Sequence, residues 1–149
     1  MAKNARPKKK YKQKRVFGLP KVFRHDSSAD MSLQLIPHAE LEKFKTGDAD
    51  EFTWNTVCFR LNWGYVMSGD HFDSEDARAL MESSLAAIRS VNERHQRTGR
   101  WGTTGEEFNI IGQALNLTDE MQMATTRRQQ DESLSTLLRL NELKLKGAL

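Results

Sequence analysis

Residues 74–99, SEDARALMESSLAAIRSVNERHQRTG, contain the clearest helical pattern in the chain. Ser74 or Asp73 can accept a hydrogen bond from the first helical turn, and Gly99 can end the helix in a left-handed conformation. Glu75 and Asp76 suit the positive N-terminal end of the helix dipole. Apolar and small residues recur at spacings of three and four: Ala77, Leu80, Met81, Ser84, Leu85, Ile88 and Val91. The segment therefore predicts an amphipathic helix with one face in a core.

Helix boundaries are also marked in the preceding segment. Pro37 is suited to the first position of a helix that Gly47 ends. Asp48 and Glu51 stand in capping-box register, and they predict a second helix that extends to about Ser68. Two helices are therefore expected before residue 74.

Within this second helix, residues 56–66 fit two periodicities. Apolar side chains alternate as in a strand at Val57, Phe59, Leu61, Trp63 and Tyr65. Helical spacing is matched by Phe52, Thr56, Phe59, Trp63 and Val66. The length of the segment and its N-terminal cap favour a largely buried helix, with a strand as the alternative.

A further helix is expected after the loop RTGRWGTTGEE, residues 97–107. Thr103 or Thr104 can cap it, with Glu106 or Glu107 reaching back. Gly112 lies inside this helix, where glycine costs about 1 kcal/mol relative to alanine but can let another helix approach closely.

The last helix is expected to begin at Thr118, after a turn at Asn116 and Leu117, and to continue towards Lys146 with an exposed middle or a break near Asp131. Residues 104–130 would then have the spacing of a helix-turn-helix. However, the second of its helices would begin with Asp119 and Glu120, which phosphates repel. A sequence-specific reader of this type is therefore disfavoured.

Together these signals predict an all-α fold. We expect a compact bundle of four to five helices in residues 26–149, preceded by a basic, disordered N-terminal arm in residues 1–25. The core is expected to be dominated by Trp54, Phe59, Trp63, Leu80, Leu85, Ile88, Phe108, Ile111 and Leu115.

Charge is divided very unevenly along the chain. Residues 1–25 contain ten Lys or Arg and no Asp or Glu, whereas the remaining residues contain 13 basic and 20 acidic residues. The formal net charge of +3 therefore hides a cationic arm on an anionic body. Such asymmetry is typical of an arm that faces a polyanion.

Nucleic acid is the partner that this arm predicts, because cationic side chains gain affinity for phosphates through counterion release. Tyr11 and Phe17 could stack on the bases of a single strand. A second contact could be formed by the arginines Arg94, Arg97 and Arg100 together with Trp101. The candidate nucleic-acid-binding residues are Lys3, Arg6, Lys8, Lys9, Lys10, Tyr11, Lys12, Lys14, Arg15, Arg97, Arg100 and Trp101. The alternatives for the arm are a solvated tail, a tail that folds onto the acidic body, and an arm that binds an acidic protein partner. For the loop, the alternative is a tryptophan that covers the helix end between solvent-facing arginines.

Several classes of protein are disfavoured. Cys58 is the only cysteine, so neither an intrachain disulfide nor a thiolate-rich metal site can form. The cluster GDHFDSED, residues 69–76, lacks the alternating ligands of an EF-hand and is better explained as a turn before a capped helix. No catalytic residues, metal or cofactor are predicted, and neither a membrane span nor a secretory signal is found. A cytoplasmic location is expected.

Four stretches resemble a set of small, mostly helical proteins encoded by phages, prophages and plasmids of Gram-negative bacteria. They are RPKKKYKQK (residues 6–14), KTGDADEFTWNTV (45–57), RTGRWGTTGEEF (97–108) and ALNLTDEMQMAT (114–125). The resemblance implies a mobile-element origin, a helical fold and action in the cytoplasm of a bacterial host, and it transfers no catalytic residue.

The expected function is therefore that of a non-enzymatic phage or prophage accessory protein. It would bind DNA, RNA or a nucleoprotein complex through its arm. The alternative is a protein-binding inhibitor of host defence or replication machinery, in which the acidic helical body mimics phosphates and contacts a host or phage protein. The sequence leaves the nucleic acid's type and the oligomeric state open.

Overall fold

The fold consists of α-helices, as the sequence predicts. A computed structural model describes residues 27–145, with side chains for residues 31–143, and it contains no strand in that range. The helices are α1 (Ser27–Thr46), α2 (Glu51–His71), α3 (Glu75–Thr98), α4 (Gly105–Ala124) and α5 (Arg127–Leu145). The predicted disordered arm, residues 1–25, lies outside the described residues.

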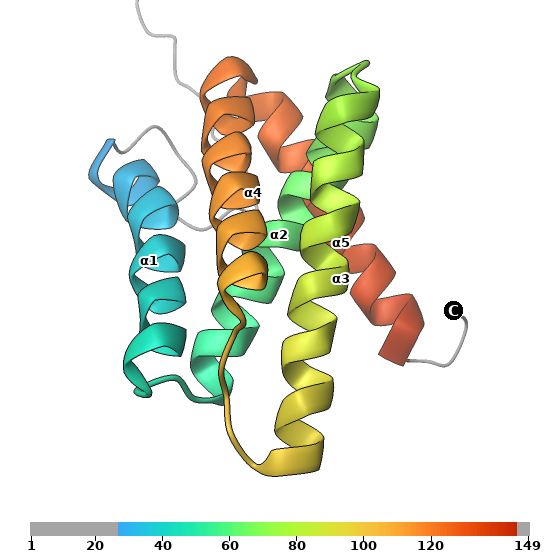
Figure 1. Ribbon diagram of the computed structural model, residues 1–149. Helices are drawn as coiled ribbons and strands as arrows, with labels where there is room; N and C mark the ends of the chain where they lie inside the picture. The colour runs from blue at the N-terminus through green and yellow to red at the C-terminus, as the bar shows by residue number, and fades with distance from the viewer. Residues whose placement is uncertain (1–26, 146–149) are drawn as a thin grey trace, which may run out of the picture.

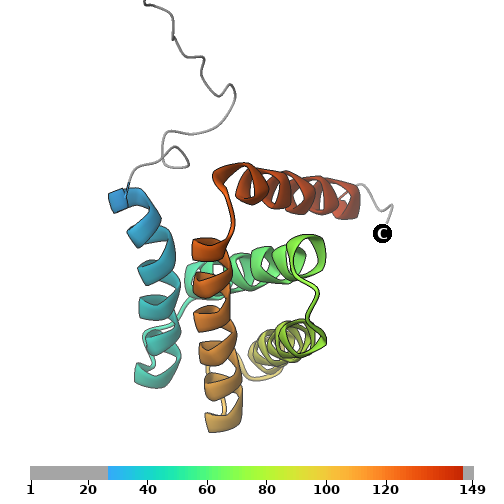
Figure 2. The ribbon, with the colours of Figure 1, turned by 90° about the horizontal axis from the view of Figure 1, so that it is seen from above.

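Helix α2 is the central element of the bundle. It contacts each of the other four helices, and Figures 1 and 2 show α1, α3, α4 and α5 arranged around it. Its sequence suits this position, since Arg60 is the only charged residue between Glu51 and Asp70. α1 and α4 run antiparallel beside each other (Figure 1), whereas α5 packs mainly across α2 (Figure 2).

Gly64 allows α2 to approach α3 and α4 closely. A Cβ atom at this position would overlap the Thr118 hydroxyl of α4 and would come within 2.8 Å of Met81 Cε of α3. At Gly112, by contrast, a Cβ atom would meet only Leu41 Cδ2, at 3.8 Å. The close helix approach expected at Gly112 is therefore found at Gly64 instead.

Several predicted boundaries are confirmed. Residues 56–66 are helical. Ser74 accepts a hydrogen bond from the backbone of Ala77, and Gly99 ends α3 with a φ of 78°. Thr104 and Glu107 form a complete capping box at the start of α4.

The predicted starts of the first two helices are wrong. α1 begins at Ser27, so Pro37 lies inside the helix that it was expected to begin. The side chain of Pro37 is buried. α2 is capped by Asp50 and Thr53 rather than by Asp48 and Glu51. The Thr53 hydroxyl also donates to Glu40 Oε1 of α1 at 2.9 Å. This contact between two helices favours a cap at Asp50 over a cap at Asp48.

The predicted turn at Asn116 and Leu117 is also wrong, and with it the helix-turn-helix. Thr118 is fully buried inside α4, where its hydroxyl donates to the Ala114 carbonyl at 2.8 Å. Helix α4 ends at Ala124, so the break between the last two helices lies earlier than the expected break near Asp131. Thr126 and Gln129 form a reciprocal cap at this break, since each backbone N–H donates to the other's side chain.

Of the nine predicted core residues, four are buried, four are partly buried and one is exposed. Trp63, Ile88, Ile111 and Leu115 are buried. Trp54, Leu80, Leu85 and Phe108 are partly buried and pack against the core. Phe59 is 39% exposed and does not belong to the core, because α2 is apolar on two faces and only one of them is covered by α3 and α4.

Candidate binding groove

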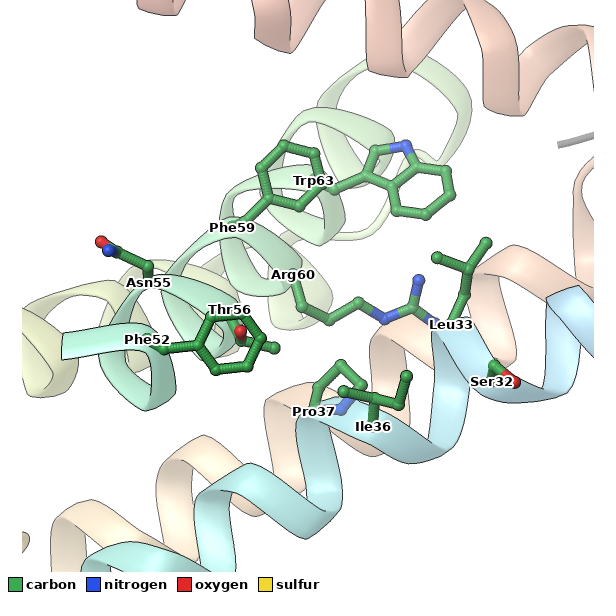
Figure 3. A pocket seen from close by; sticks show the side chains of 10 residues that line it. All are labelled: Ser32, Leu33, Ile36, Pro37, Phe52, Asn55, Thr56, Phe59, Arg60 and Trp63. Atoms are coloured by element: carbon green, nitrogen blue, oxygen red, sulfur yellow. The ribbon is translucent and has the colours of Figure 1, made fainter. Parts of the chain in front are cut away.

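An open, apolar groove of about 400 Å³ lies between α1 and α2. Its volume is within the range of roughly 300–1,000 Å³ that is typical of ligand pockets. The lining residues, shown in Figure 3, are Ser32, Leu33, Ile36, Pro37, Phe52, Asn55, Thr56, Phe59, Arg60 and Trp63. The groove therefore combines three aromatic side chains of α2 with an aliphatic wall from α1.

Helical spacing explains why these side chains meet. Phe52, Phe59 and Trp63 stand seven and four positions apart, so they lie along one face of α2. Leu33 and Pro37 are four apart on α1 and face the same space. Pro37 has no N–H, so it cannot donate to the Leu33 carbonyl in the helical ladder.

Arg60 is the charged residue of the groove, and it is only 3% exposed. Figure 3 shows its side chain extending from α2 towards Leu33 of α1. Its Nη2 atom donates to Asp119 Oδ1 at 2.8 Å and to Gln122 Oε1 at 2.6 Å. Asp119 Oδ2 lies 2.8 Å from His38 Nε2. A polar chain thus connects α1, α4 and α2 behind an apolar surface.

The Arg60 charge is balanced inside the protein. Burial lowers the pKa of Arg60 from its ordinary value, and the hydrogen bond and charge of Asp119 oppose this shift. An arginine remains protonated at neutral pH. Asp119 therefore supplies the counter-charge, and a molecule entering the groove need not be anionic.

Two donors of Arg60 remain unfilled. Nε and Nη1 are buried and have no hydrogen-bond partner among the described residues. A buried donor without an acceptor costs about 1–3 kcal/mol. Both nitrogens are buried behind the lining, so the groove presents a mainly apolar surface to an occupant.

Arg60 is a functional candidate that the sequence analysis missed. It lies on the buried face of α2 with Val57, Leu61 and Gly64, at spacings of three and four. A single charged residue at such a position indicates a buried ion pair. That pattern could have identified Arg60, although it could not have identified Asp119 as its partner.

The predicted sites in the arm (Lys3, Arg6, Lys8, Lys9, Lys10, Tyr11, Lys12, Lys14 and Arg15) lie outside the described residues. The other three lie at the end of α3 and in the following loop. Trp101 stacks on His95 with ring centroids 3.7 Å apart and packs against the core. Arg97 and Arg100 are exposed. Arg100 and Trp101 line a shallow hollow together, whereas Arg97 does not line it.

Arg94 braces this loop. It donates to the Gly102 carbonyl at 2.8 Å and forms a two-pronged ion pair with Glu107, with N···O distances of 3.1 and 2.9 Å. The pKa of Arg94 is raised by its hydrogen bond with Glu107. Burial, the largest single cause, would raise the pKa of Glu107, but Arg94 and Thr104 together lower it. Arg94, which was expected to belong to the basic contact, is instead held by Gly102 and Glu107 and has a structural role.

The acidic turn between α2 and α3 forms no metal-binding cluster. Within residues 27–145, no three His, Cys, Asp or Glu side chains converge. None of the helices in this range combines the length and the apolar character that a membrane span requires.

No protein-family model, curated protein or solved structure matches the chain.

Proposed function

We propose that the protein is a non-enzymatic accessory protein of a phage or prophage. It binds nucleic acid, or a nucleoprotein, through its basic N-terminal arm in the cytoplasm of the bacterial host. The observation that carries this proposal is the concentration of ten Lys or Arg, without any Asp or Glu, in residues 1–25. A polyanion is the partner that such a segment attracts most strongly.

The arrangement of cations in the helical body supports this assignment. Arg60 and Arg94 are held by Asp119 and Glu107, at N···O distances of 2.8 and 2.9 Å. These arginines stabilise the bundle and are not available to phosphates. The body as a whole has more acidic than basic residues, so it would repel phosphates and limit indiscriminate coating of DNA.

The test is a salt series with the full chain and a variant that lacks residues 1–24. If about six arm cations contact phosphates of a duplex, log affinity falls with log salt at a slope near −5. Deletion should abolish binding to both DNA and RNA probes. A matched control, Arg97→Gln with Arg100→Gln, removes two exposed cations of the loop and should lower the slope by about 2 at most. Absence of binding by the full chain, or binding that survives the deletion, would refute the proposal.

A second candidate function is protein binding through the acidic body. Four carboxylates are exposed around the α2–α3 turn: Asp70, Asp73, Glu75 and Asp76. They could mimic phosphates towards a host or phage protein that binds nucleic acid. A partner captured in the presence of nuclease, and lost when these four residues are changed to their amides, would favour this function over the first.

A further inference from the structure

Large apolar side chains of the groove lining are exposed. Phe52, Ile36 and Phe59 are 63%, 48% and 39% exposed. A concentration of large apolar side chains on one face usually marks a surface that another segment covers.

We infer that residues 16–23 of the same chain, VFGLPKVF, occupy this groove. The segment contains six apolar residues, a glycine and one lysine, and no acidic residue. It lies immediately before α1, the helix that forms one wall of the groove. Aromatic-lined grooves of this kind suit apolar segments that contain proline.

The charge of the Arg60 guanidinium does not call for an acidic occupant. Asp119 Oδ1 lies 2.8 Å from Arg60 Nη2 and supplies the counter-charge. Residues 16–23 contain no acidic residue, and Pro20 leaves the segment with one fewer N–H that would need its own partner. The segment therefore suits a groove whose lining is mainly apolar.

The length of the chain permits this arrangement. Ile36 lies nine residues after Ser27, about 14 Å along the helix axis. The eight residues of the segment reach about 26 Å when extended, and residues 24–26 allow the chain to reverse direction. Because the segment is attached next to its site, its effective concentration is on the order of millimolar.

Docking of this segment would place the basic residues 3–15 beside the α1–α2 face. The inference is independent of the proposed nucleic-acid binding, since it concerns contacts within one chain. It can therefore be tested without any nucleic acid.

The test is photo-cross-linking in the full chain. Benzoylphenylalanine replaces Phe17 in one variant and Tyr11 in a control variant, and mass spectrometry locates the cross-links. We expect the probe at position 17 to join residues 32–37 or 52–63 of the same molecule, and the probe at position 11 to show no such preference. A second measurement uses Phe59→Ser, which removes an apolar side chain of the groove. This variant should lower the ratio of molecules with residues 16–23 docked to molecules with them undocked roughly tenfold, or by about 1.4 kcal/mol. Leu138→Ser, at an exposed position on α5, should leave the ratio unchanged.

Three outcomes would overturn the inference. Cross-links from position 17 could scatter over the surface without favouring the groove. They could join two molecules, which would make a second copy the occupant. They could also reach the groove equally well in the Phe59→Ser variant, which would show that proximity rather than binding produces them.

Discussion

Replacing Asp119 tests whether the Arg60 charge is balanced within the bundle. In Asp119→Ala, Arg60 keeps the hydrogen bond to Gln122 but loses its counter-charge while remaining 97% buried. Removing one partner of a buried ion pair typically costs 3–5 kcal/mol. Because the Asp119 side chain is 20% exposed, we expect the lower end, about 3 kcal/mol of unfolding free energy.

Replacing Arg60 should cost much less. Arg60→Met retains the apolar stem and removes two donors that lack acceptors, and Asp119 keeps His38 and some solvent contact. We therefore expect a loss of about 1 kcal/mol or less. The double variant should resemble Arg60→Met alone, which gives a coupling energy of about 2–3 kcal/mol.

The assay is urea unfolding of all three variants, followed by tryptophan fluorescence and circular dichroism. Glu120→Ala, an exposed neighbour on α4, is the matched control and should change stability by less than about 0.5 kcal/mol. The reasoning is refuted if Asp119→Ala costs under about 1 kcal/mol, or if the two single losses add in the double variant. In either case Arg60 would not depend on Asp119, and the expectation that an occupant of the groove need not be anionic would lose its basis.

Two further predictions concern packing and pH. Gly64→Ala should destabilise the protein by about 1–3 kcal/mol, because the added methyl overlaps the Thr118 hydroxyl. Gly112→Ala should instead stabilise the protein by about 0.5–1 kcal/mol through helix propensity. Thermal unfolding of the two variants measures both changes, and equal effects would contradict the packing argument. The lowered pKa of Glu107 beside Arg94 gives stability that is present above the carboxyl's ordinary pKa of 4.5 and is lost as the pH falls through the lower folded value. Glu107→Gln should therefore flatten the acid limb of the stability curve in urea titrations from pH 7 to pH 3, and an unchanged limb would show that the Arg94 pair does not contribute.

Local sequence patterns predicted helix ends correctly where a single side chain determines the backbone conformation. The caps at Ser74 and Thr104 and the left-handed stop at Gly99 are formed by residues within four positions of one another. Such hydrogen bonds and backbone preferences do not depend on the rest of the fold. For the same reason, the periodicity and length of residues 74–99 predicted α3 correctly.

Local patterns failed where several similar signals competed. Thr118 and Thr126 both look like helix caps, but Thr118 is buried beside Gly64 and only Thr126 forms a reciprocal cap with Gln129. Asp48 and Asp50 are equally plausible caps, and the contact between Thr53 and Glu40 selects Asp50. In both cases the deciding atom comes from another part of the chain.

The sequence by itself determined that this protein is helical and that its cations are concentrated in residues 1–25, because both properties follow from residue order. Only the tertiary structure decided which face of α2 is covered. That helix is apolar nearly all round, so its sequence favours burial on every side. Packing against α3 and α4 at Gly64 buries one face of α2. The opposite face leaves Phe52 and Phe59 exposed in the groove, above a buried Arg60 whose Nε and Nη1 atoms have no hydrogen-bond partner among the described residues.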